Sequence, residues 1–201
     1  MKKKTILTLL ISCLSLFVLA QASSKLDENN GFKDYKFGDK LKGYLKMKKF
    51  SDSYFVNDQN VLRIPAKDLS IGDIPVKYVD LYFIDSLLSK IEVFLPVQYN
   101  NDLLTACKNV FGTPDSMHYK SDTSGKKEDI PDMIVSESYW HGAEIKLSFS
   151  DLSNKFYTTP EKDSPLYKKL TVKLVYELKN YQELLAKKKD VIIETKTKSD
   201  F

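Results

Sequence analysis

Few side chains of this 201-residue chain could carry out chemistry by themselves, because it has only two histidines, His118 and His141, and one cysteine beyond residue 22, Cys107. A nucleophilic mechanism needs a hydroxyl or thiol beside a base, and a zinc site needs several His, Cys or carboxylate ligands. The sequence has no such spacing, no HExxH or GxSxG motif and no glycine-rich phosphate loop. It therefore predicts no metal, no cofactor and no catalytic residue that a motif identifies.

Four residues are candidates for binding a ligand or partner: Trp140, His141, Tyr78 and Tyr82. Trp140 and His141 are adjacent at the end of a predicted strand, where both rings could face one ligand. The alternative is that Trp140 covers the edge of the core and His141 lies in an exposed turn. Tyr78 and Tyr82, with Phe94, could form an aromatic patch that stacks on sugar rings or on a partner protein, unless a helix buries them.

The elements that would position these residues are mostly strands. Residues 76–84 and 88–95 alternate apolar and polar side chains around an Asp85-Ser86 turn, which is typical of an antiparallel hairpin with one wet face. Further strands are expected at 54–56, 61–64, 133–140, 144–150 and 170–176, with turns at 57–60 and 141–142 and loops at 115–131 and 151–167. We therefore expect an α+β fold, a mainly antiparallel sheet of about six strands with one or two helices packed on one face.

The strongest helical pattern covers residues 101–111, where five apolar side chains recur at helical spacing: Leu103, Leu104, Cys107, Val110 and Phe111. Asn101 is the expected N-cap, and Gly112 is expected to end the helix. Cys107 lies in the middle of the apolar stripe, so we expect a buried hydrophobe and not a reactive thiol. A second, short helix is expected at 180–189.

A third helix is expected before residue 50, with Asp39 capping its start. This segment also carries a run of lysines at Lys40, Lys42, Lys46, Lys48 and Lys49. A solvated helix face is the favoured interpretation of the run, and contact with anionic lipid or polysaccharide is the alternative.

The first twenty-two residues have the layout of a secretory signal peptide: lysines at 2–4, an apolar run from Thr5 to Ala20, and a small-x-small cleavage signal at 20–22. We expect cleavage after Ala22, a periplasmic or secreted product, and no transmembrane segment in the mature chain. The alternative is a lipoprotein anchored through Cys13, which follows a lipobox-like Leu10-Ile11-Ser12. The apolar residues that follow Cys13 argue against it.

Removing the leader changes what the charge predicts. The full chain has 31 basic and 27 acidic residues, but the leader holds three lysines and no acid, which leaves 28 against 27. Arg63 is the only arginine, and lysine lacks the bidentate fork that suits phosphates, so we expect no nucleic-acid partner. With Cys107 alone after cleavage, no intramolecular disulfide is possible.

The chain is expected to divide into a signal peptide (1–22), a disordered lead-in (23–31), one domain (32–189) and a flexible tail (190–201). Within the domain, four different short motifs follow one another along the chain: Phe32–Gly38, Leu81–Asp85, Phe111–Pro114, and Trp140 with Ile145–Leu147. This pattern resembles that of uncharacterised secreted or envelope proteins of Bacteroidetes-type bacteria. The resemblance implies an α+β domain and transfers no catalytic residue.

These expectations combine into a functional hypothesis. The chain is expected to be an exported, non-enzymatic binding domain of the bacterial periplasm or envelope, whose partner is an envelope protein or a polysaccharide. Two alternatives stay open: a periplasmic hydrolase that acts through carboxylates near Trp140, and an inhibitor of a secreted enzyme. The 27 acids keep the first open, because they offer many chance pairs.

Overall fold

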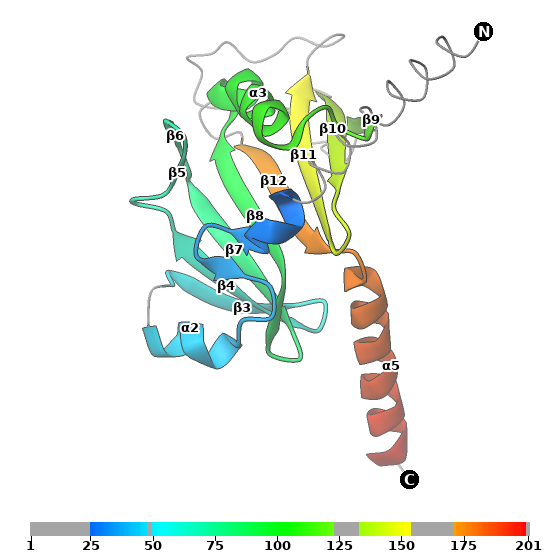
Figure 1. Ribbon diagram of the computed structural model, residues 1–201. Coiled ribbons are helices and arrows are strands. Elements are labelled where there is room, and N and C mark those ends of the chain that lie inside the picture. The colour runs from blue at the N-terminus through cyan, green and yellow to red at the C-terminus, as the bar shows by residue number, and fades with distance from the viewer. Residues whose placement is uncertain (1–24, 48–49, 123–132, 154–170, 200–201) are drawn as a thin grey trace, which may run out of the picture.

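One eight-stranded antiparallel sheet dominates the computed structural model (Figure 1). Across the sheet the strands are β3 (Asp52–Val56), β4 (Gln59–Pro65), β7 (Tyr78–Ile84), β8 (Leu87–Pro96), β12 (Thr171–Leu178), β11 (Ile145–Ser153), β10 (Met133–His141) and β9 (Ser116–Asp122). The structure describes residues 25–47, 50–122, 133–153 and 171–199, so the predicted leader and Cys13 lie outside the described residues. The predicted α+β class with a mainly antiparallel sheet is confirmed.

Two of the strand connections are tight turns that the sequence encodes locally. Asn57 and Asp58 have φ of 48° and 61°, and Asp85 and Ser86 have φ of 49° and 67°. Two consecutive residues with positive φ form a type I′ turn, whose twist matches that of the flanking strands. The predicted Asp85-Ser86 turn is therefore confirmed, and the predicted turn at 57–60 is shorter because β4 begins at Gln59.

One face of the sheet forms the core. Its buried side chains alternate along the central strands: Val79, Leu81, Phe83, Ile91, Val93, Leu95, Ile145, Leu147, Phe149, Val172, Leu174 and Tyr176. The helix α3 (Asn100–Phe111), which follows the 3₁₀ turn η1 (Val97–Tyr99), packs on this face through Leu103, Cys107 and Phe111. Burial of these apolar surfaces is the main stabilising term of the fold.

The details of α3 differ from the predicted helix in two ways. Its N-cap is Tyr99 without a side-chain cap bond, because η1 leads directly into the helix; the predicted cap at Asn101 is wrong. Val110 is 46% exposed, so the buried stripe is narrower than predicted. The predicted stop is confirmed, since Gly112 has φ of 80° and its N–H bonds to the carbonyl of Lys108.

The N-terminal segment lies on the same face of the sheet as α3 (Figure 1). It contains a helical turn at 25–29, the hairpin of β1 (Gly31–Phe32) and β2 (Tyr35–Lys36), and the helix α2 (Leu41–Met47). The hairpin of β5 (Ser70–Ile71) and β6 (Ile74–Pro75) packs beside them, with Ile74 in the core.

The predicted disordered lead-in is wrong for residues 25–31. Leu26 is 1% exposed within the core, and the Asp27 carboxylate accepts hydrogen bonds from the backbone N–H groups of Ala143, Glu144 and Ile145. One buried leucine and one carboxylate thus attach this segment to the turn between β10 and β11. Because this segment is mostly polar, its sequence does not indicate that Leu26 and Asp27 are contact residues.

Two further predictions need correction. Part of the predicted loop at 115–131 is the edge strand β9, whose Met117 and Tyr119 are 44% and 64% exposed; an edge strand with little buried surface has no apolar alternation to recognise. The predicted flexible tail at 190–201 is helical up to Ser199, because α5 (Tyr181–Ser199) is longer than the predicted helix at 180–189. Residues 123–132 and 200–201 lie outside the described residues.

Among the helices in the described ranges, none is both long enough and apolar enough to span a bilayer.

Candidate binding pocket

Two surfaces of the molecule gather tyrosines and carboxylates. The first is the face of the sheet opposite α3, which we call the charged face. It is formed by side chains from five neighbouring strands: Tyr54, Arg63, Tyr78, Asp80, Tyr82, Lys90, Glu92, Phe94 and Lys173. Tyr78 and Tyr82, two of the residues predicted from the sequence, belong to it.

Asp80 is the centre of the first group on the charged face. Its carboxylate is 1% exposed and accepts two hydrogen bonds from the guanidinium of Arg63, at 2.8 and 2.7 Å, and one from the hydroxyl of Tyr54 at 2.9 Å. The two strands that carry Arg63 and Asp80 are directly paired, so the fork of the only arginine in the sequence reaches both carboxylate oxygens. This arrangement satisfies a charge that would be costly to bury alone.

Glu92 is the centre of the second group. It is 8% exposed and accepts hydrogen bonds from Lys90 at 3.1 Å, Lys173 at 3.3 Å and the Tyr82 hydroxyl at 3.0 Å. Burial alone would raise the pKa of Glu92, but the two lysines and these hydrogen bonds outweigh burial and lower it. Lys90 also lies over the rings of Tyr82 and Tyr181, at 3.8 and 5.3 Å from their centroids.

The aromatic patch predicted around Tyr78 exists, but its ring faces are occupied. Tyr78 stacks on Phe94 with a centroid separation of 4.4 Å, and the Arg63 guanidinium lies 4.2 Å from its ring centroid. Because β4 and β8 flank β7 on opposite sides, Arg63 and Phe94 cover opposite faces of the ring. Neither face of Tyr78 is left for a sugar ring.

Trp140 and His141 point to opposite sides of the sheet. Trp140 is 3% exposed in the core, and its indole N–H donates to the carbonyl of Gly112 at 2.8 Å. His141 is exposed; its backbone N–H donates to Asp115 at 2.7 Å, and its Nδ1 lies 3.2 Å from the same carboxylate. The structure therefore corresponds to the alternative in which Trp140 covers the edge of the core and His141 lies outside it.

The four predicted residues do not meet in one site. Three strands separate β7, which carries Tyr78 and Tyr82, from β10, which carries Trp140 and His141. At about 4.8 Å between neighbouring strands, this places the two pairs about 19 Å apart. Cys107 agrees with its prediction: it is 4% exposed, and burial raises the pKa of its thiol to about 12, so it stays protonated and inert.

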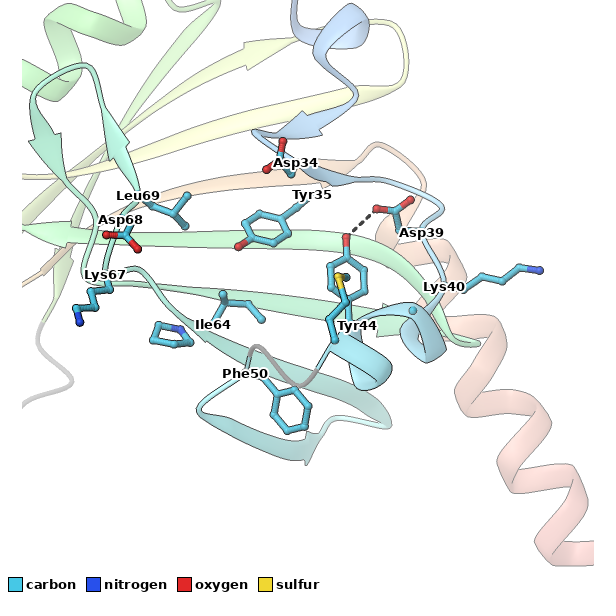
Figure 2. Close-up of a pocket in the computed structure, with 13 residues that line it drawn as sticks. Asp34, Tyr35, Asp39, Lys40, Tyr44, Phe50, Ile64, Lys67, Asp68 and Leu69 are labelled. Carbon is cyan, nitrogen blue, oxygen red and sulfur yellow. Dashed lines mark hydrogen bonds between the residues drawn. The ribbon is translucent and has the colours of Figure 1, made fainter.

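The second surface is a pocket of about 840 Å³ between α2, β2 and the chain that follows β4 (Figure 2). We call it the α2 pocket. Its lining consists of Asp34, Tyr35, Asp39, Lys40, Gly43, Tyr44, Met47, Phe50, Ile64, Pro65, Lys67, Asp68 and Leu69. Pockets of this volume are typical of small-molecule sites.

Asp39 and Tyr44 shape the wall of the pocket that is nearest α2. The Tyr44 hydroxyl donates to Asp39 at 2.7 Å (Figure 2). The backbone N–H of Lys36 donates to the same carboxylate at 3.2 Å. Asp39 therefore joins β2 to α2 in place of the predicted cap on the first helical turn. Burial, and then the bond to Asp39, raise the pKa of Tyr44, whose ring packs against Phe83 and Tyr35.

Apart from Asp39 and Tyr44, the polar side chains around the pocket are not paired with one another. The side chains of Asp34, Lys40, Lys67 and Asp68 are exposed, and none of them forms a hydrogen bond or ion pair with another described residue. The hydroxyl of Tyr35, whose ring lies in the middle of the pocket in Figure 2, forms no hydrogen bond with the described part of the chain. Burial and the nearby Asp34 raise the pKa of this hydroxyl, so it stays protonated and able to donate.

This arrangement suits binding by contact. The rings of Tyr35, Tyr44 and Phe50 and the side chains of Ile64 and Leu69 provide an apolar floor, while the unpaired carboxylates, lysines and hydroxyl lie above it. An aromatic ring accepts a flat apolar surface, and free carboxylates accept hydrogen bonds from hydroxyl groups. No group of three metal-ligating side chains occurs among the described residues.

Sequence reasoning missed the α2 pocket. The only local signal is that Tyr35, Tyr44 and Phe50 lie close together along the chain. Nothing in the sequence indicates that Ile64 and Leu69 complete the floor, because β3 lies between them and α2 in the chain and only tertiary packing joins them.

Comparison with known proteins gives no match: no protein-family model, no curated protein and no solved structure matches the chain. The resemblance to Bacteroidetes-type envelope proteins therefore stays a prediction.

Proposed function

We propose that the chain is a non-enzymatic binding domain that works in the bacterial periplasm or envelope, and that the α2 pocket is its ligand site. The observation that carries this proposal is the pairing of an aromatic, apolar floor with polar groups that have no partner among the described residues. Because these groups form no bond within the described fold, their donors and acceptors stay available to a bound ligand.

Of the two expected partner classes, polysaccharide suits the pocket better than protein. Protein partners usually need a flat surface of about 800 Å² on each side, whereas the α2 pocket is a concave site with the size of a small-molecule site. A sugar ring offers an apolar face for the half-buried rings of Tyr35 and Phe50 and hydroxyl groups for Asp34 and Asp68. The proposed ligand is therefore a short segment of an envelope polysaccharide.

The hydrolase and inhibitor alternatives gain no support from a specific observation. The hydrolase was expected to act with Trp140, but the indole of Trp140 is buried and its N–H is bonded to Gly112. We therefore do not assign a catalytic role to the carboxylates of the α2 pocket.

The pocket is tested by titrating the mature protein with oligosaccharides released from envelope polysaccharide, followed by isothermal calorimetry. We expect Tyr35→Ala to weaken binding by about tenfold or more, because a lost ring contact and hydroxyl bond together amount to at least 1.4 kcal/mol. Tyr119→Ala on β9 is the matched control, since Tyr119 is 64% exposed and far from the pocket. Equal binding by both variants, or binding by neither variant nor the parent, would contradict the proposed site.

The location is tested separately. Cell fractionation and mass spectrometry of the N-terminus should find the chain outside the cytoplasm and beginning at Ser23. A lipidated Cys13 would favour the lipoprotein alternative, and an unprocessed cytosolic chain would refute export.

A further inference from the structure

A second, smaller hollow lies on the other side of α2 from the α2 pocket. It has a volume of about 410 Å³ and is lined by Lys40, Leu41, Lys42, Leu45, Asp85, Ser86 and Leu87. Its two walls are α2 and the turn between β7 and β8, which an antiparallel bridge between Lys40 and Leu87 holds together. We call it the leucine hollow.

Two aliphatic side chains are exposed in the leucine hollow. Leu45 of α2 is 42% exposed, and Leu87 at the start of β8 is 43% exposed. A single exposed leucine is common on protein surfaces, but here leucines from two separate elements line one hollow. The fold leaves apolar surface in contact with water at this point.

Unpaired positive charge surrounds these leucines. Lys42 and Lys46 lie one turn apart on α2, both are exposed, and neither forms an ion pair with a described residue. The one carboxylate that lines the hollow, Asp85, already faces Lys188 of α5 at 3.8 Å. The hollow therefore combines apolar surface with a net positive charge.

Helix geometry places these groups on one side of α2. At about 100° per residue, Leu45 projects about 60° from Lys42 and about 100° from Lys46. A flat surface that touches Leu45 can therefore also be reached by both lysines, whose long aliphatic stems let the ammonium groups extend sideways. Tyr44 points the other way, into the core, so this contact does not require α2 to move.

We propose that the leucine hollow and the lysines of α2 form a contact site for an anionic lipid membrane. Charge complementarity selects this occupant: each lysine near an anionic bilayer contributes about 1 kcal/mol, and exposed leucines gain free energy by entering the interface. A purely electrostatic partner would leave the leucines in water, and a purely apolar partner would leave the lysines without counter-charges. The contact is peripheral and reversible, and of the residues that line the leucine hollow only Lys40 also lines the α2 pocket.

The test is co-sedimentation of the mature protein with vesicles of phosphatidylcholine alone or mixed with phosphatidylglycerol. We expect binding to the mixed vesicles only, with weaker binding at high salt. Lys42→Gln and Lys46→Gln should each lower the partition coefficient about fivefold, and Leu45→Ser should lower it without changing the salt dependence. Lys108→Gln, on α3, is the matched control and should leave it unchanged.

Four outcomes would overturn the proposal. These are no binding to the mixed vesicles, equal binding to both kinds of vesicle, an effect of Lys108→Gln as large as that of Lys42→Gln, or full binding by Leu45→Ser. Dextran sulfate serves as a soluble polyanion: if it binds as well as the vesicles do and Leu45→Ser does not matter, the site recognises polyanions and not a membrane. Thermal unfolding of each variant checks that the fold is retained, as expected for exposed positions.

Discussion

The charged face and the α2 pocket both place tyrosines beside carboxylates, but they use them differently. On the charged face, Asp80 and Glu92 are buried, and each is bonded to a cation and to a tyrosine hydroxyl. In the α2 pocket, Asp34 and Asp68 are exposed without a partner in the described chain. The same residue types therefore stabilise the fold in one place and stay free for a ligand in the other.

The difference follows from the elements that carry each set. Paired strands hold side chains of neighbouring strands about 5 Å apart in fixed register, so opposite charges on adjacent strands meet and neutralise each other. The walls of the α2 pocket come from a helix, a two-residue strand and a connecting segment, which diverge and leave space between them. A flat surface rich in tyrosine is thus not by itself evidence for a binding site.

The largest predicted effect is on the charged face. Asp80→Ala should lower the free energy of unfolding by about 3 kcal/mol, because it leaves Arg63 and Tyr54 without their shared acceptor. This value is at the lower end of the stability losses that follow when one partner of a buried ion pair is removed, because the Arg63 side chain is 35% exposed. Urea unfolding gives the value, with the exposed Asp73→Ala as control. A loss no larger than that of the control would show that the charged face does not stabilise the fold.

The next effect concerns the N-terminal anchor, which holds the segment that forms one wall of the α2 pocket. Asp27→Ala removes three hydrogen bonds to the β10–β11 turn and should cost about 2 kcal/mol, and it should also weaken ligand binding. Gly142→Ala should act similarly, because a Cβ there would overlap the Asp27 carboxylate. Glu28→Ala is the neighbouring exposed control. Unchanged stability in both variants would contradict the anchor.

The contribution of Glu92 to stability should depend on pH. The pKa of Glu92 is lowered in the folded state, so its contribution is complete above the unfolded pKa of about 4.3 and is lost as the pH falls through the folded pKa. Glu92→Gln should therefore destabilise by about 1–3 kcal/mol at neutral pH. This difference should shrink in acid below about pH 4. A difference that does not change with pH would mean that the ion pairs do not stabilise the folded state.

The smallest effect is expected at the rim of the α2 pocket. Asp68→Ala and Lys67→Ala should change the free energy of unfolding by about 0.5 kcal/mol or less, because neither side chain has a partner in the described chain to lose. Thermal unfolding measures this, and calorimetry should show weaker ligand binding by Asp68→Ala. A large loss of stability would place Asp68 among the residues that hold the fold.

The sequence predicts the strongly patterned part of this molecule. The hairpin around Asp85-Ser86 and the α3 helix have clear periodicity and turn residues, and both are found in the structure. The edge strand β9 and the residues around Leu26 were missed, because the first buries little apolar surface and the second depends on one leucine and one carboxylate.

The site was less predictable than the fold. The alternation of apolar and polar residues correctly placed Tyr78 and Tyr82 on the face away from the core. It could not show that Arg63, on the neighbouring strand β4, covers the ring of Tyr78. Adjacent residues in a strand point to opposite sides, which already separates Trp140 from His141. The α2 pocket arises from tertiary packing between segments that are distant in the chain, and a single sequence carries no signal of that packing.

The most direct test of the account is an NMR titration of the ¹⁵N-labelled mature protein with oligosaccharides released from envelope polysaccharide. We expect the largest amide shift changes at the residues around Tyr35, Tyr44 and Leu69, and none at those around Glu92 and Lys173. Changes concentrated around Glu92, Phe94 and Lys173 instead would contradict the proposed site, because the charged face and not the pocket would then bind the ligand.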